Sequence, residues 1–410
     1  ADAAMYGSLG SNGVLLINTQ QASDMETKIE FQTVDGVGFM KKRFPVLGAE
    51  AFKNYISDVA ETKYTDLNKL TTDFPFLKDD PEDHYRYLYD NDTKWQDEIY
   101  TPAVSSENVL KIKGGDAIAT YALSAGFLSN KGVVKNTQQQ KYYTRLNSNI
   151  NITKKLEMSF GVGFNYGKYD LMEQGLVRET NPMIAAMLKS PLLSVYKQDQ
   201  YRNNLPDYNP VQIFGISNPV AVVNDVDAES RAYDVLVNLG LKYQLTPSIS
   251  LDALGGLYYN YTKEKIFIPG KTSGAIASLQ DGLAENTVRG GTGEGLSFYV
   301  KATGVYSRMF NNLHEVSAKL GYQLMSTRRE LDCSNGINTS SDFYHTLGDA
   351  SEGRNITGYI DQTRWINTFL NLNYGFNRQY YIGATVGLDA SSVYGKNSGR
   401  AFWMPAVQLA

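Results

Sequence analysis

The sequence is poor in the residues on which several classes of protein depend. Its one cysteine, Cys333, excludes an internal disulfide and a Cys-x-x-Cys zinc site. The three histidines, His84, His314 and His345, stand alone and lack the His-x-x-x-His spacing of a zinc site, so we expect neither a metal nor another cofactor. No Gly-x-Ser-x-Gly nucleophile elbow occurs. With no catalytic constellation, the chain is not expected to be an enzyme.

An excess of positive charge and long apolar runs are also missing. Lysine and arginine number 39 against 43 aspartates and glutamates, for a formal net charge of −4. Such a balance provides no broad basic surface and argues against nucleic acid as a partner. No stretch reaches the roughly 18 apolar residues of a membrane helix. That absence excludes helical spans only, because a transmembrane β-barrel hides its apolar band in alternate positions.

Tyrosine and glycine, by contrast, are abundant. The 410 residues include 29 Tyr and 36 Gly, against 17 Phe and 3 Trp. Tyrosine is favoured where a ring lies between an apolar layer and water. The length allows two or three ordinary domains or one large all-β domain.

Alternation of apolar and polar residues is the dominant pattern. In residues 233–245 every second residue is apolar, from Tyr233 through Val237 to Leu245. About twelve strands of membrane-spanning length are predicted, some from this period-2 pattern and some from the turn residues on either side of them. They are expected at 28–38, 108–113, 118–128, 141–152, 156–166, 233–245, 249–261, 298–307, 315–324, 365–375, 380–388 and 402–410.

The connections between these strands alternate in length. Turns of a few residues join them in pairs, and long polar segments separate the pairs. The long segments are 39–106, 129–140, 168–230, 263–294, 326–361 and 391–399. We therefore predict an all-β, transmembrane antiparallel β-barrel with periplasmic turns and extracellular loops. A soluble sandwich would mix the connection lengths and bury the apolar faces.

Three local features complete the prediction. Aromatic residues near strand ends suggest girdles at the membrane interfaces, with ordinary cross-strand packing as the alternative. They are Tyr142, Tyr143, Tyr258, Tyr259, Tyr380, Tyr381 and Trp403. Residues 49–62 carry apolar side chains at helical spacing and predict a short amphipathic helix. The glycines of residues 290–295 resemble a phosphate loop without its Lys-Ser/Thr, and a flexible external loop is expected there instead.

The opening stretch carries a more specific signal. It combines small residues, the glycines Gly7, Gly10 and Gly13, and an apolar run at 14–17 that suits a buried strand. Its order, Ala-rich, Tyr-Gly, Asn-Gly-Val, hydrophobic, Thr, resembles the end of the plug domain of SusC/RagA-like TonB-dependent outer-membrane transporters. The resemblance implies a plug–barrel junction formed by Tyr6, Gly7, Asn12 and Gly13.

Three later segments extend this resemblance. Residues 92–100 are similar to a family segment before the second barrel strand, although Lys94 replaces the usual Asp, which leaves any contact of that Asp in doubt. Residues 126–137 and 402–410 match further family runs. Family barrels have about 22 strands around a plugged lumen. The resemblance thus implies that 1–20 is the C-terminal end of the plug, that 21–410 is the N-terminal half of the barrel, and that the chain is an internal fragment.

The resemblance also implies a function. A ligand, usually an oligosaccharide or a peptide, would be captured by the loops and a SusD-like surface lipoprotein. It would be released when the TonB–ExbB–ExbD system pulls on the plug of a barrel embedded in outer-membrane lipid. Flat rings stack on sugars and tolerate varied peptides, so the loop residues Trp95, Tyr196, Tyr201 and Tyr208 are candidates for substrate binding, with packing inside the loops as the alternative. A second hypothesis is a SusC-like barrel that serves as a structural subunit of a larger outer-membrane secretion or assembly complex.

Overall fold

A computed structural model of the chain describes residues 2–15, 26–78, 80–173, 175, 177–272, 274–280, 282–395 and 399–410, without the side chains of 2–4 and 67. Most of these residues belong to one antiparallel sheet of 12 strands, which are adjacent in chain order. The strands are β1 (Lys28–Gly38), β2 (Ala103–Gly115), β3 (Ala119–Lys131), β4 (Gln138–Thr153), β5 (Leu156–Asp170), β8 (Asp227–Thr246), β9 (Ile249–Ile268), β10 (Thr287–Phe310), β11 (His314–Thr339), β12 (Ala350–Phe376), β13 (Tyr380–Ser391) and β14 (Ala401–Leu409).

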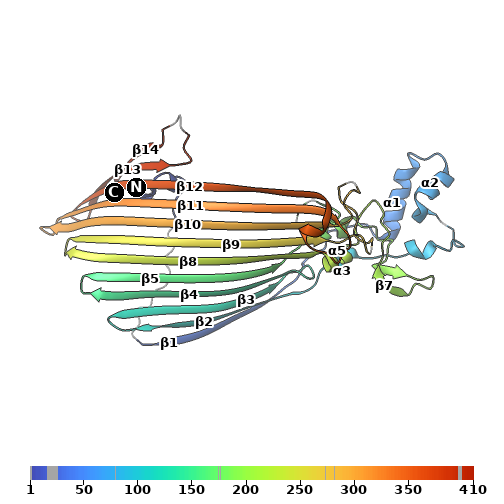
Figure 1. Cartoon of the computed structure of the whole chain (residues 1–410), viewed down its shortest axis with the longest axis horizontal. Helices are drawn as coiled ribbons and strands as arrows, with labels where there is room; N and C mark the ends of the chain where they lie inside the picture. The colour runs from blue at the N-terminus through green and yellow to red at the C-terminus, as the bar shows by residue number, and fades with distance from the viewer. Residues whose placement is uncertain are drawn as a thin grey trace.

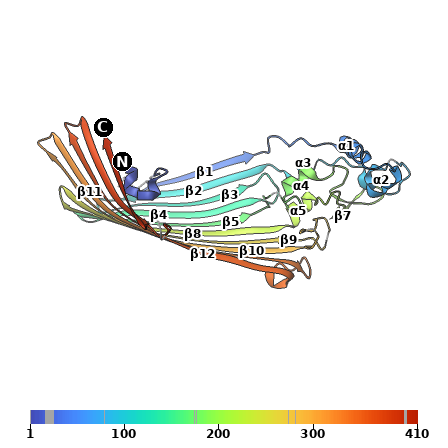
Figure 2. The ribbon, with the colours of Figure 1, turned by 90° about the horizontal axis from the view of Figure 1, so that it is seen from above.

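The sheet curves into a trough, with β1 and β14 at its two edges (Figures 1 and 2). Turns of two or three residues, such as 154–155 and 311–313, lie at one end. The connections that follow β1, β3, β5, β9 and β11 gather at the other end (Figure 1). This is the wall of an antiparallel β-barrel, as the alternation and the connection lengths predicted.

The two faces of the sheet differ as predicted. Along β8, Val235 lies opposite Phe164 and Tyr259, so apolar side chains from three strands share the convex face. Leu239 and Leu241 on this face are 45% and 41% exposed, which excludes a compact water-soluble core around them. The concave face carries polar groups, among them the buried Gln323 and Asn367.

Several strands extend further toward the loops than expected. Residues 290–295 lie inside β10, where Gly291 pairs with Glu264 and Cys333, so the prediction of a flexible external loop is wrong. Likewise β11 and β12 leave a connection of only residues 340–349 instead of 326–361. Glycines and charges weaken the local strand signal, whereas hydrogen bonding to a neighbour on each side maintains the strand.

Three of the predicted girdle residues are on the wrong face. Neighbouring residues in a strand point to opposite faces, so only one residue of each tyrosine pair can face lipid. Tyr143 and Tyr258 face the concave side, where their hydroxyls donate to Glu107 and Asp234, each at 2.7 Å. The register places Tyr381 on that side too, and Tyr142, Tyr259, Tyr380 and Trp403 on the convex side.

A continuous row of aromatic side chains crosses the convex face near the loops. Successive ring centroids are 4.7, 6.2, 4.9 and 6.3 Å apart. The row consists of Phe127, Tyr142, Tyr166, Tyr233 and Tyr261, one from each of β3, β4, β5, β8 and β9. We call it the aromatic row. Its position at one level of the sheet is that of an interface girdle.

The long connections fold into an assembly of short helices beyond the barrel wall (Figure 1). It contains α1 (Ala49–Glu61), which confirms the predicted amphipathic helix, and α2 (Leu67–Asp73), α3 (Trp95–Ile99), α4 (Pro182–Leu188), α5 (Pro219–Asp225), and the hairpin of β6 (Tyr196–Gln198) and β7 (Asn204–Tyr208). Single 3₁₀ turns are η2 (Pro75–Leu77), η3 (Arg86–Tyr89) and η4 (Leu347–Asp349). We call this the loop assembly. None of the helices in the described residues is both long and apolar enough to cross a membrane.

An Asn-Pro pair starts each of two helices in this assembly. Asn181 and Asn218 cap α4 and α5, and each side-chain oxygen accepts hydrogen bonds from two backbone N–H groups of the first turn. Proline follows at the first helical position, where a missing N–H costs nothing. The helices bury Ala186 and Val220 in an apolar core that they share with α3.

Candidate functional site

The first segment of the chain is seated on the concave face of the sheet. It forms the 3₁₀ segment η1 (Asp2–Gly10), which lies inside the trough against β12 and β13 (Figure 2). At Gly7 the backbone takes φ 56° and ψ −143°. A Cβ at this position would overlap the carboxylate of Asp389 and lie 2.7 Å from Nδ2 of Asn367. Glycine is therefore required both by the backbone conformation and by the close approach to the wall.

Asp389 on β13 is the centre of this contact. Its side chain is fully buried, and its two oxygens receive four hydrogen bonds. Oδ2 accepts from the backbone N–H of Ser8 at 3.1 Å and from Nε1–H of Trp365 at 2.7 Å. Oδ1 accepts from the hydroxyls of Ser8 and Tyr394, each at 2.8 Å. We call these residues, with Gly7, the Asp389 junction.

The junction connects parts of the chain that are far apart in sequence. Ser8 comes from η1, Trp365 from β12, and Tyr394 from the connection between β13 and β14. Every donor is neutral, so hydrogen bonds alone satisfy the buried carboxylate. If any one of these donors were lost, the carboxylate of Asp389 would lack one hydrogen bond, and water could not replace it because the site is buried.

A second contact lies beside the junction. Nε2 of Gln323, a residue 1% exposed, donates to the carbonyl of Met5 at 2.7 Å. Its Oε1 accepts from the hydroxyl of Tyr299 at 2.8 Å. The ring of Tyr6 lies 5.8 Å from Nζ of Lys301, within cation–π range. The wall therefore holds η1 through its backbone and through one aromatic ring.

The predicted junction residues divide into two groups. Tyr6 and Gly7 contact the wall, whereas Asn12 is exposed and a Cβ at Gly13 would meet nothing within 4 Å. Val14 and Leu15 are not in a strand, and the remainder of the apolar run predicted as a strand at 14–17 lies outside the described residues. Sequence reasoning missed Asp389, Trp365 and Gln323. Their only signal is a polar side chain, or a tryptophan, at an inward position of an alternating strand.

Trp95 does not have the free ring that stacking on a ligand requires. It is 3% exposed, and its Nε1–H donates to the carbonyl of Ser190 at 2.9 Å. Its ring packs in the core of the loop assembly with Ile99 and Leu193. In this structure Trp95 stabilises the loop assembly, which corrects its predicted role.

The three predicted tyrosines lie together on the β6–β7 hairpin. The rings of Tyr196 and Tyr208 stack with centroids 5.5 Å apart and an interplanar angle of 18°. The hydroxyl of Tyr208 accepts from Nδ2 of Asn224 at 2.8 Å, and burial raises the pKa of Tyr208 above its ordinary value. Tyr201 lies between the two strands and is 76% exposed. Of the four predicted residues, Tyr201 offers the most open ring surface.

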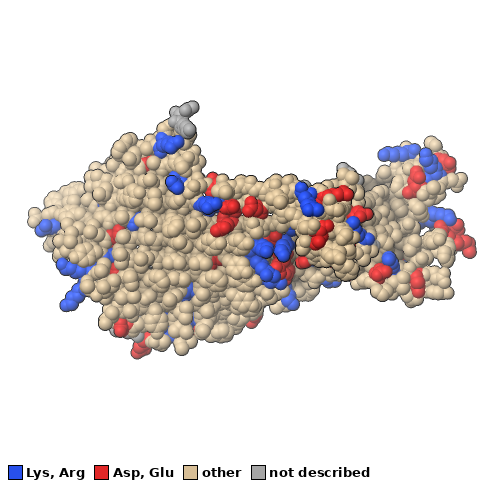
Figure 3. All heavy atoms as spheres, viewed as in Figure 1, with Lys and Arg blue, Asp and Glu red and all other residues tan. Residues whose placement is uncertain are grey.

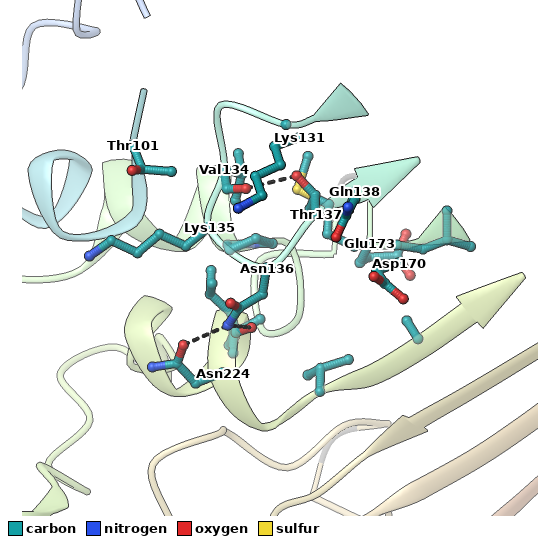
Figure 4. A pocket seen from close by; sticks show the side chains of 18 of the residues that line it. Thr101, Lys131, Val134, Lys135, Asn136, Thr137, Gln138, Asp170, Glu173 and Asn224 are labelled. Carbon is teal, nitrogen blue, oxygen red and sulfur yellow. Dashed lines mark hydrogen bonds between the residues drawn. The ribbon is translucent and has the colours of Figure 1, made fainter. Parts of the chain in front are cut away.

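A cavity of about 630 Å³ lies where the loop assembly meets the ends of the strands (Figure 4). Its lining includes Lys131, Gln138, Asp170 and Glu173, so both signs of charge line the space. Nδ2 of Asn136 closes one side by donating to Oδ1 of Asn224 at 2.8 Å. Apolar side chains such as Met172 and Val222 line it as well, and its strand residues Gln138 and Asp170 belong to the convex face, so this part of the cavity lies on the outer side of the wall.

The cavity differs from the predicted binding site. None of Trp95, Tyr196, Tyr201 and Tyr208 is among its lining residues.

Within the described part of the chain, no group of three or more His, Cys, Asp or Glu side chains is arranged to hold a metal ion.

Curated proteins and solved structures similar to this chain match it over nearly its whole length, whereas no protein-family model matches it. It is 23% identical over 414 residues to the TonB-dependent receptor P3 of Formosa agariphila, an alignment that covers 98% of this chain and 37% of that protein. It is 22% identical over 429 residues to the TonB-dependent receptor SusC of Bacteroides thetaiotaomicron, with 96% and 38% covered.

The solved structure of the RagAB peptide transporter has the same fold. The TM-score is 0.79 at 17% sequence identity, and the match covers 99% of this chain and 47% of that one. The chain thus spans less than half the length of the relatives that it matches. These relatives are receptors and transporters and not enzymes.

Proposed function

Starting from the confirmed resemblance of this chain to the SusC/RagA-like TonB-dependent transporters of the bacterial outer membrane, we propose that it takes part in the import of oligosaccharides or peptides. Residues 1–20 would form the end of the plug and 21–410 the N-terminal half of the barrel. The observation that carries the proposal is the Asp389 junction, in which a segment at the start of the chain is seated inside the curved wall. A barrel that only allowed solutes to diffuse through its lumen would not need a plug segment bound inside it.

The geometry supports different roles for the two ends of the barrel, with ligand capture at the loop end and TonB action at the other. The loop assembly would meet the ligand first, because it lies beyond the ends of the strands and carries the exposed Tyr201. A SusD-like surface lipoprotein would cover this end. At the opposite side of the plug, the TonB–ExbB–ExbD system would supply the force that displaces the plug. The Asp389 junction then defines the resting position from which the plug moves.

The cargo is proposed only by class. RagAB is a peptide transporter, and this chain shares the fold of its solved structure at low sequence identity. The loop assembly carries amides, hydroxyls and charges of both signs, which peptides and oligosaccharides can both satisfy. Tyr201 adds a flat ring for stacking.

Uptake by cells that produce the full-length protein tests the proposal. Fluorescently labelled peptides and oligosaccharides would be offered to wild-type cells, to cells lacking the protein, and to cells lacking TonB. We expect at least one ligand to enter only when both the protein and TonB are present. If no ligand depends on either, while a larger outer-membrane complex fails to assemble without the protein, the chain is a structural subunit and the import proposal is wrong.

A Tyr201→Ala variant examines the loop assembly within the same assay. We expect slower ligand uptake by cells that produce this variant, because loss of a stacking ring removes apolar contact area and weakens ligand binding. Tyr85→Ala is the matched control, since Tyr85 is 62% exposed in the same assembly and is not a proposed binding residue. Equal losses in the two variants would count against a role of Tyr201 in binding.

A further inference from the structure

Basic side chains occupy the next level of the convex face on the loop side of the aromatic row. Tyr166 lies opposite Tyr233, and Tyr233 opposite Tyr261. Two residues nearer the loops, Lys168 lies opposite Arg231, and Arg231 opposite Lys263. Because side chains two apart share a face, these three cations form a row directly beside the aromatic row.

One level further, the charges are mixed. Asp170 lies opposite Glu229, and Glu229 opposite Lys265. We call the six side chains of these two levels, Lys168, Asp170, Glu229, Arg231, Lys263 and Lys265, the charged band. Figure 3 shows basic and acidic groups gathered toward the loops on this face, with a largely uncharged region between them and the end that bears the short turns.

The positive charge of the band is only partly neutralised. Lys168 contacts Glu229 at 3.1 Å and Asp170 at 3.5 Å, and Arg231 pairs with the same Glu229. Lys263 and Lys265 are exposed, and neither forms an ion pair with a residue that the structure describes. The two carboxylates of the band therefore pair with Lys168 and Arg231. Lys263 and Lys265 remain available to bind an external anion.

The band is closed on its loop side. The ring of His345 stacks on Phe267 with centroids 3.9 Å apart, and its Nδ1 lies 3.6 Å from Asp227. The β11–β12 connection, which carries His345, thus covers the next level of the convex face. The charged band lies between this cover and the aromatic row and is about two residue pairs high, roughly 14 Å of strand. Its height and position match the headgroup region beside an interface girdle.

We propose that the charged band binds the phosphate groups of outer-membrane lipid, with Lys263 and Lys265 as the principal contacts and Arg231 beside them. Aromatic rings would pack on the upper part of the acyl chains, while the basic groups a few ångströms away hold the phosphate. A lipid is favoured over another anion because the cations face outward from the wall and lie directly next to lipid-facing rings. The inference rests on the outer-membrane location of the chain and not on the import proposal.

The test compares lipid binding by two double variants of the full-length protein. Lys263→Gln with Lys265→Gln removes two charges from the band. Lys41→Gln with Lys42→Gln removes two charges from exposed lysines of the loop that follows β1. Each delipidated protein is titrated in detergent with a bisphosphorylated glycolipid or with its dephosphorylated form, and bound lipid is counted by native mass spectrometry.

We expect the band variant to bind the phosphorylated lipid about thirtyfold more weakly than wild type, since each basic group near an anionic lipid surface contributes roughly a factor of five. The loop variant should match wild type, and the dephosphorylated lipid should bind all three proteins equally weakly. Unchanged heat-dependent migration of the variants in gels confirms that the barrel has folded.

Three results would overturn the inference. One is equal binding of the phosphorylated lipid by the band variant and wild type. Another is displacement of the lipid by millimolar inorganic phosphate, which identifies a site for free phosphate. The third is loss of a surface lipoprotein from the band variant with lipid binding intact, which makes the band a protein interface.

Discussion

At the scale of single residues, one buried carboxylate connects the start of the chain to its last strands. Asp389 has no cationic partner among its hydrogen-bond donors, and four neutral donors converge on it. Its position is therefore specified by geometry, because all four donors must be in place at once. This arrangement makes the seating of η1 sensitive to a change of one or two atoms.

Asp389→Asn tests this sensitivity. The amide replaces one acceptor by a donor, which then faces groups that also donate, so we expect the seating of η1 to weaken by about 1–3 kcal/mol. Hydrogen exchange of residues 5–10 in the full-length protein should become faster. Asp361→Asn, which changes an exposed carboxylate on β12, is the control and should leave exchange unchanged.

A pair of glycine variants separates steric fit from backbone preference at the same site. Gly7 and Gly13 both have positive φ, 56° and 96°, but only Gly7 faces the wall. Gly7→Ala should therefore accelerate exchange more than Gly13→Ala. If both glycine variants and Asp389→Asn exchange like wild type, the Asp389 junction does not hold η1.

A buried lysine gives the loop assembly a pH dependence. Lys189 is 4% exposed, and its Nζ donates to the carbonyls of Val211 and Ile216 at 2.8 and 2.7 Å. Burial lowers the pKa of Lys189 from 10.5 to about 7. Below pH 7 the folded and unfolded forms both carry the proton, so the cost of burying the charge is fully present. Above pH 7 the folded form releases its proton first, and stability should rise with pH by at most about 1.4 kcal/mol per unit.

Hydrogen exchange of residues 190–209, corrected for intrinsic rates, measures this effect between pH 7 and 9. We expect slower opening at pH 9 in wild type and little change in Lys189→Gln. Lys197→Gln removes a lysine paired with Asp207 at the surface and should keep the wild-type pH dependence. A flat profile in wild type would show that Lys189 stays protonated.

At the scale of elements, the alternation along each strand separates a lipid face from a lumen face. On β8 the neighbours Asn238 and Leu239 point to opposite faces, and Leu239 is 45% exposed on the convex side. Strand centres were predictable because period-2 patterning is a local property. Strand ends were not, since β10 and β11 continue through Gly290 and Asn335 only because neighbouring strands hold them.

Arginine substitutions at these two positions test the assignment of faces. Leu239→Arg places a charge toward the bilayer interior, and we expect a loss of about 2–4 kcal/mol in the free energy of folding into vesicles. Asn238→Arg points into the lumen and should cost much less. Urea titration of the full-length protein in vesicles provides the comparison. Equal costs would contradict the assigned faces.

At the scale of the whole molecule, the sheet has two open edges. Among the residues that the structure describes, β1 pairs only with β2, and β14 only with β13. Apolar side chains near both edges are highly exposed, among them Phe31 at 69% and Val407 at 72%. Unpaired backbone groups in lipid cost several kcal/mol each, so this wall requires further strands to be stable in a membrane.

Residues 1–410 produced alone should therefore fail to form a barrel. After addition to detergent micelles or vesicles, we expect no difference between heated and unheated samples in gel migration. The full-length protein should show the shift typical of a folded barrel. A heat-sensitive compact band from residues 1–410 alone would mean that β1 and β14 can pair with each other.

The sequence by itself determined the class of the protein, the strand centres, the side of the long loops and, through its opening motif, the family that it resembles. These properties depend on spacing between near neighbours and on order along the chain. Only the tertiary structure decided which tyrosine of each pair faces lipid, that Trp95 is buried, and that Asp389 receives Ser8. Each of these depends on contacts between segments up to 381 residues apart, and no local pattern specifies which distant donor will meet a given acceptor.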